Sequence, residues 1–163
     1  MLALVFEVAG ARYAIRCRNV VEVIPRVTLR AVPQASAWLC GFFAYRGGLT
    51  AVVDLCALIG GYPCPERLSS RIVLARSDAA PDAPVVGLLA EGMTEARPVR
   101  SSPLSGASRG LAPYMREMVE EDGALLQIVD EAAILRSAGC GLEAVPFQAR
   151  LGSGEKGRER PPA

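Results

Sequence analysis

The fold of this chain is decided by residues 39–53, LCGFFAYRGGLTAVV, in which Arg46 is the only charged residue. The runs on either side, 39–45 and 49–53, are rich in aromatic and β-branched residues and predict two paired strands. Gly47 and Gly48 tolerate the positive φ angles of a two-residue hairpin loop. We therefore predict a hairpin with Gly47-Gly48 as its loop and Arg46 as the last residue of the first strand. An arginine there is either a solvated charge or a contact for a partner.

Short apolar segments separated by Gly, Pro and Asp continue along the chain and predict an all-β barrel or sandwich. The expected strands are 2–8, 12–16, 27–32, 39–45, 49–53, 71–76, 85–90, 94–99, 114–119 and 124–129. Three short helices are expected at 19–24, 55–59 and 131–136, the first stopped by Pro25. Asp54 and Asp130 are the expected N-caps of the second and third, and Asp122-Gly123 is a hairpin turn.

An internal echo relates residues 48–59 to residues 123–135. In both, a glycine turn leads into an apolar strand that ends on a capping aspartate and a short helix. This repetition is consistent with two similar small barrels.

Composition sets limits on function. The chain has 163 residues, 51% of them hydrophobic, which suits a single domain. Its formal net charge of +1 gives no overall electrostatic attraction to nucleic acid or to a membrane. There is no secretory signal and no apolar run long enough to span a bilayer, so we expect a cytoplasmic protein. We expect residues 1–137 to form the folded domain and residues 141–163, which have few residues to pack, to be a disordered tail.

The sequence gives no sign of catalysis or of a cofactor. The chain contains no histidine and five cysteines without metal-ligand spacing, which we interpret as small core residues. Residues 106–110 match the G-x-S-x-G hydrolase pattern, but no strand precedes Ser108 and no histidine can serve as its base. We therefore expect no enzyme, no metal and no cofactor.

Taken together in order and spacing, these motifs resemble the CheW family of bacterial chemosensory adaptors. The chain keeps the family's pattern at Gly41, Arg46, Gly47, Asp54 and Leu55 and departs from it at Ala44, where asparagine is usual. Residues 6–15 look like the family's opening hairpin and 20–24 like its following short helix. The strands at 71–74, 86–93 and 125–130 come in the expected order, so the resemblance covers about residues 2–135.

The resemblance implies two intertwined five-stranded barrel subdomains of SH3-like or OB-like type, with a boundary at about 65–85. It also implies a non-enzymatic adaptor that couples a methyl-accepting chemoreceptor to a CheA-type histidine kinase at membrane-associated receptor arrays, and that also pairs with other CheW-like domains. An apolar groove between the subdomains would take the receptor tip. Residues 43–45 and 64–72 suggest a divergent member similar to the adaptors of Wsp-type surface-sensing systems.

The same resemblance assigns candidate contact residues. Arg46, Val20 and Glu22 match the family's receptor-binding positions. We place the kinase-binding surface near Val23, Ile24, Val27 and Leu29. Turns and caps are assigned to Gly41, Gly47, Gly48, Asp54, Asp122, Gly123 and Asp130.

A second class of function stays open at this point. The first thirty residues contain five arginines against two glutamates, and exposed aromatic residues could stack on bases. A small OB-like or SH3-like barrel that binds nucleic acid through these arginines is the alternative. Steep loss of binding with salt would identify it.

Overall fold

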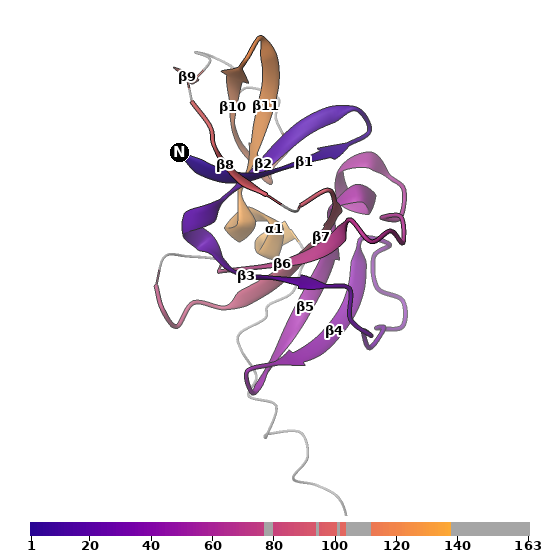
Figure 1. The fold of residues 1–163 in the computed structure, drawn as a ribbon. Coiled ribbons are helices and arrows are strands. Elements are labelled where there is room, and N and C mark those ends of the chain that lie inside the picture. The colour runs from indigo at the N-terminus through magenta and orange to yellow at the C-terminus, as the bar shows by residue number, and fades with distance from the viewer. Residues whose placement is uncertain (77–79, 94, 101, 104–111, 138–163) are drawn as a thin grey trace, which may run out of the picture.

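The computed structural model describes residues 1–76, 80–93, 95–100, 102–103 and 112–137 (Figure 1). Ser108, Cys140 and the expected tail at 141–163 lie outside these residues. The protein is all-β, as predicted, with two sheets and a few short helices. Among the described residues, no helix is both long enough and apolar enough to cross a membrane.

One sheet has five strands in the order β3-β6-β7-β5-β4. Its strands are β3 (Val20–Pro25), β4 (Leu39–Tyr45), β5 (Gly48–Asp54), β6 (Ser70–Arg76) and β7 (Val85–Glu91). All neighbours pair antiparallel except β5 and β7, which are parallel.

The other sheet has six strands in the order β8-β1-β2-β11-β10-β9. Its strands are β1 (Leu2–Val8), β2 (Ala11–Arg16), β8 (Ala96–Pro98), β9 (Ser102–Pro103), β10 (Met115–Glu121) and β11 (Ala124–Val129). The parallel pairing of β2 with β11 joins the two ends of the described chain in one sheet.

The two sheets are interleaved in sequence. The chain leaves the six-stranded sheet through the 3₁₀ turn η1 (Cys17–Asn19) and returns to it after β7. Both β6 and β7 belong to the five-stranded sheet, so the chain does not change sheets at 65–85, where the boundary was expected. The five-stranded sheet is an insertion between the two halves of the other sheet.

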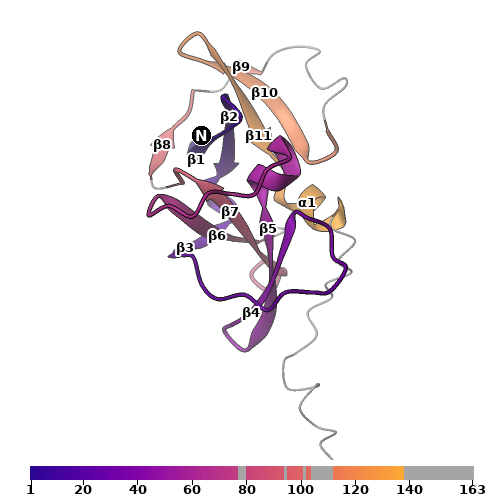
Figure 2. The same cartoon turned by 90° about the vertical axis from the view of Figure 1, so that its right-hand side faces the viewer.

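The larger hydrophobic core lies where the sheets face each other. It includes Phe6 and Ile15 from one sheet, Val52 and Leu88 from the other, and Ile134 of α1 (Glu131–Ser137). Both views place α1 at the level between the two sheets (Figures 1 and 2). Ala3, Ala14, Val99, Val119, Leu126 and Ile128 form a smaller cluster of their own. Alternate residues of β1 therefore serve different cores, as the period of a strand requires.

Two of the predicted elements are wrong. Residues 20–24 form most of strand β3 rather than a helix, because β-branched side chains favour an extended backbone and β6 offers a ladder to pair with. Residues 27–32 are not a strand, apart from one bridge between Arg30 and Phe42. Pro25 has no N–H to continue the ladder of β3 beyond that point.

Candidate functional site

The tip of the β4–β5 hairpin differs from the prediction by one residue. Cross-strand pairing extends to Tyr45 and Gly48, so the loop is Arg46-Gly47 and Gly48 belongs to β5. Arg46 has φ 48° and Gly47 has φ 77°. A non-glycine residue in this left-handed region costs about 1–2 kcal/mol, which the pairing of the strand ends offsets. The hairpin itself is confirmed, and it projects at the end of the five-stranded sheet far from the other sheet (Figure 1).

Arg46 takes part in a cluster with Tyr45 and Glu22. The hydroxyl of Tyr45 donates a hydrogen bond of 2.8 Å to Glu22 Oε2. The guanidinium carbon of Arg46 lies 5.1 Å from the centre of the Tyr45 ring, and Arg46 Nη2 lies 3.9 Å from the same Glu22 oxygen. The Arg46 side chain is 69% exposed and that of Glu22 is 46% exposed. The cluster is thus a charged surface feature held by an aromatic ring.

Glu22 reaches this cluster because of the shape of β3. The register of β3 against β6 shifts between Val20 and Glu22, which marks a β-bulge. Bulges re-aim the side chains of an edge strand. Val20 and Glu22, both matched to receptor-binding positions, flank this irregularity. Val20 is half-buried against the larger core, so it has some surface left for a partner.

The two outer strands of the five-stranded sheet approach each other through side chains and one bridge. Tyr45 and Glu22 belong to β4 and β3, which are its two edges. The chain after β3 also reaches β4, where Arg30 and Phe42 exchange two backbone hydrogen bonds of 2.8 and 2.9 Å. Gly41 makes this approach possible, because a Cβ there would lie 2.4 Å from the Arg30 carbonyl oxygen. Its φ of 139° also disfavours any other residue.

The four residues predicted to bind the kinase are not equivalent. Val23 and Val27 are 39% and 38% exposed. Ile24 and Leu29 are half-buried and pack against the larger core. On strand β3, Glu22 and Val23 lie on opposite faces because successive residues alternate. Val23 therefore faces away from Glu22, whereas Ile24, two residues after Glu22, lies on the same face of β3 as Glu22.

Asp54 and Asp130 lie at the starts of helical turns and Asp122-Gly123 lies in a hairpin loop, where the sequence predicts them, whereas Gly48, predicted as a loop residue, belongs to β5. Asp130 Oδ1 accepts a hydrogen bond of 2.9 Å from the N–H of Ala133, at the start of α1. Asp122 and Gly123 form the β10–β11 loop with φ angles of 51° and 76°.

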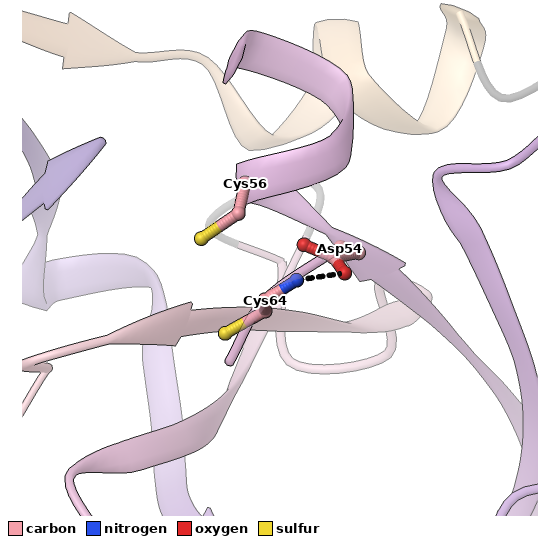
Figure 3. Close-up of side chains that lie close together, drawn as sticks. All are labelled: Asp54, Cys56 and Cys64. Atoms are coloured by element: carbon pink, nitrogen blue, oxygen red, sulfur yellow. Dashed lines mark hydrogen bonds between the residues drawn. The ribbon is translucent and has the colours of Figure 1, made fainter. Parts of the chain in front are cut away.

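Asp54 holds two segments together (Figure 3). Its Oδ1 accepts a hydrogen bond of 3.0 Å from the N–H of Ala57 in η2 (Cys56–Gly60). Its Oδ2 accepts a hydrogen bond of 2.8 Å from the N–H of Cys64. The carboxylate thus caps the helical turn, as predicted, and also fixes the loop that follows it.

The same aspartate and two thiols have the spacing of a metal site. Ligand atoms of Asp54, Cys56 and Cys64 all lie within 4.8 Å of one another, and all three residues are buried. Both carboxylate oxygens already accept backbone N–H groups. Burial raises the pKa of the Cys64 thiol to about 12 and also raises that of Cys56. Protonated, enclosed thiols are poor ligands and poor nucleophiles, so the arrangement suits a structural role.

A surface cleft of about 630 Å³ lies at the seam between the β1–β2 hairpin and the loop after η2. It is lined by Val5, Phe6, Glu7, Ala9, Gly10, Arg12, Tyr62, Arg67, Glu91 and Gly92. Arg67 pairs with Glu91 at 2.5 Å and Arg12 with Glu121 at 2.7 Å. The cleft is more polar than the apolar groove expected for a receptor tip, and none of the matched receptor-binding residues lines it.

Sequence reasoning missed Tyr45 and Glu131. Tyr45 was assigned to an apolar strand, although a tyrosine beside the exposed tip of a hairpin has a hydroxyl that needs a partner. Glu131 is 3% exposed, and its Oε2 accepts a hydrogen bond of 3.3 Å from Asn19 Nδ2. This bond connects α1 to η1, through which the chain passes from one sheet to the other. No sequence signal distinguishes this glutamate from an exposed one in a first helical turn.

Comparison with known protein families assigns the chain to one of them. The sequence matches the family model described as CheW-like domain over residues 2–139. The chain belongs to the CheW-like domain family. Proteins of this family are non-catalytic scaffolds and adaptors of chemotaxis signalling that interact with chemoreceptors and CheA.

Structural comparison supports the CheW-like fold. The scaffolding protein TtCheW from Thermoanaerobacter tengcongensis is similar, with a TM-score of 0.64 and 20% sequence identity. The match covers 78% of this chain and 87% of TtCheW. A search of curated protein sequences gives no significant match. The resemblance inferred from the motifs is thus confirmed, and the protein is a chemotaxis scaffold or adaptor.

Proposed function

We propose that this CheW-like protein couples a methyl-accepting chemoreceptor to a CheA-type histidine kinase and has no enzymatic activity of its own. The observation that carries the proposal is the cluster of Arg46, Tyr45 and Glu22. It presents a fixed pair of opposite charges at the end of a rigid sheet, in a chain whose family consists of adaptors. An adaptor needs surfaces held at fixed relative positions, and paired strands supply them.

The receptor contact is proposed at Arg46, Glu22 and Val20. Arg46 and Glu22 are exposed enough to meet a partner, and the half-buried Val20 adds apolar surface beside them. A partner that presents a carboxylate to Arg46 and a donor to Glu22 would complement both charges.

The kinase contact is proposed at Val23, on the face of β3 opposite Glu22, and on the segment after β3. Val23 and Val27 supply exposed apolar surface, whereas Ile24 and Leu29 anchor that segment to the core. Exposed apolar residues beside an edge strand suit pairing with another CheW-like domain, such as the regulatory domain of a kinase. The proposed cytoplasmic location at receptor arrays follows from these two partners.

The nucleic-acid alternative is not favoured. Three of the N-terminal arginines are engaged with carboxylates, because Arg12 contacts Glu121, Arg16 contacts Glu117 and Arg26 lies 3.5 Å from Glu66. Compensated arginines give little attraction for phosphate.

Affinity purification from the native cell tests the proposal. The tagged protein is expected to recover a chemoreceptor and a CheA-type kinase together, both identified by mass spectrometry. The Arg46→Glu variant is expected to recover the kinase without the receptor. Recovery of neither partner by the unaltered protein would contradict the proposed function.

A further inference from the structure

We propose that Tyr45 is a positioning residue that fixes Glu22 and Arg46 in the geometry with which they meet the receptor. This inference rests on the proposed function, because it concerns the same surface.

The ring of Tyr45 is the common element of the cluster. Its hydroxyl donates a hydrogen bond of 2.8 Å to Glu22 Oε2. The guanidinium carbon of Arg46 lies over the ring, 5.1 Å from its centre. The ring is itself half-buried, with the ring of Phe43 6.3 Å away, centre to centre. Tyrosine has only two side-chain torsions, so holding its ring in place costs little conformational entropy.

Without Tyr45, the two charges have little reason to stay together. Arg46 Nη2 and Glu22 Oε2 are 3.9 Å apart, which is longer than a hydrogen bond. An exposed ion pair of this kind contributes little because both long side chains lose freedom in forming it. A hydrogen bond to an ionised carboxylate is stronger than a neutral one, and stacking on a ring holds the guanidinium. Tyr45 supplies both interactions.

This arrangement leaves the recognition groups of Arg46 available. Among the residues that the structure describes, none accepts a hydrogen bond from the Arg46 guanidinium. Its N–H groups can therefore form a forked contact with an acidic side chain of the receptor. Binding then loses less freedom than it would from a mobile arginine, since the side chain is already placed.

The Tyr45→Phe variant tests the inference, because it removes the hydroxyl and keeps the ring. We expect the affinity for the purified receptor signalling domain to fall about five- to tenfold, the effect of one lost hydrogen bond. Affinity for the kinase regulatory domain should stay the same. Tyr62→Phe is the matched control, because its hydroxyl bonds the N–H of Ala9 at a different place on the surface.

A double-variant comparison shows whether Tyr45 acts through Glu22. In a Glu22→Ala background, Tyr45→Phe should cause no further loss of receptor affinity, whereas independent contacts would give additive losses. Additive losses would overturn the positioning role.

A measurement without the receptor separates this inference from the proposed function. Burial and the hydrogen bond to Glu22 both raise the pKa of Tyr45. Carbon NMR of labelled tyrosine should therefore show a lower Tyr45 pKa in Glu22→Ala, and an unchanged pKa would overturn the inference. If Arg46→Glu loses receptor binding and Tyr45→Phe does not, only the inference fails. If neither variant changes receptor binding, the receptor contact proposed at Arg46 fails together with the inference, whereas the proposed function fails only if the unaltered protein does not bind the receptor.

Discussion

A Cβ atom at Gly41 would lie 2.4 Å from the carbonyl oxygen of Arg30. This contact is where the chain after β3 crosses to β4 and closes one end of the five-stranded sheet. Two features of the structure therefore explain why this position of the family pattern is a glycine. A Cβ atom would clash with the Arg30 carbonyl oxygen, and the φ angle of 139° is one that other residues rarely adopt.

Gly41→Ala should destabilise the protein by about 2–4 kcal/mol, because the added methyl group meets backbone that cannot turn aside and the backbone angle becomes strained. Gly48→Ala is the control, since the nearest atom to its Cβ would be the Tyr45 carbonyl oxygen at an ordinary 3.6 Å. Chemical denaturation of both variants measures the difference. Equal stability of the two would mean that the Arg30–Phe42 contact is not part of the folded state.

Glu131→Gln should stabilise the protein near neutral pH by roughly 1–3 kcal/mol, because a buried, incompletely paired carboxylate is replaced by a neutral amide. Glu131 is 3% exposed, and burial raises its pKa although its own backbone N–H and Asn19 act in the opposite direction. The neighbouring charge of Asp130 also raises the pKa of Glu131, and that of Arg16 lowers it.

The raised pKa of Glu131 determines how the stability gained in Glu131→Gln depends on pH. A carboxyl whose pKa is higher in the folded state stabilises the fold when protonated, and that stability is lost as the pH rises through the folded pKa. The advantage of Glu131→Gln should therefore be full at neutral pH and shrink as the solution is acidified. Denaturation across this range measures it, with the exposed Glu120→Gln as control. An advantage that grows on acidification would contradict the assignment.

Cys56 and Cys64 should react with iodoacetamide at pH 8 only when the protein unfolds. Both thiols are buried, and burial raises their pKa, to about 12 for Cys64. The thiolate is the reactive form, and little of it exists at pH 8 under these conditions. Mass spectrometry after timed labelling, with and without denaturant, locates the modified residues. Rapid labelling of Cys64 in the native protein would show that the loop held by Asp54 opens readily.

Much of the fold could be predicted because it depends on local pattern. Short apolar segments, rich in aromatic and β-branched residues in β4, located β1 and β4, and the Asp122-Gly123 pair located the β10–β11 turn. Asp54 and Asp130 were recognised as caps because capping connects residues three positions apart. A helix was predicted where residues 20–24 form a strand, because an apolar run before Pro25 fits either element until its pairing partner is known.

Long-range pairing could not be predicted from local pattern. The parallel pairing of β2 with β11 and the insertion of the five-stranded sheet depend on segments far apart in the chain. The same limit applies to the candidate site. Family resemblance named Glu22 and Arg46 together, but only the approach of β3 to β4 shows that Tyr45 lies between them. The one-residue shift of the Arg46-Gly47 loop arises because strand pairing prevailed over the preference for glycine at both loop positions.

The role of Arg46 as a receptor contact is tested by measuring the affinities of the Arg46→Glu variant for two purified partners, the receptor signalling domain and the kinase regulatory domain. Arg46 is exposed, so the variant should keep its stability within about 1 kcal/mol. Arg116→Glu on β10, also exposed, controls for the change in net charge.

Calorimetric titration should show receptor affinity falling by about a hundredfold or more for Arg46→Glu, because like charges then meet at the contact. Affinity for the kinase regulatory domain should change less than twofold, and Arg116→Glu should leave both affinities unchanged. Unaltered receptor binding by Arg46→Glu would contradict the receptor contact at Arg46 and leave this residue as a solvated charge at the tip of a hairpin.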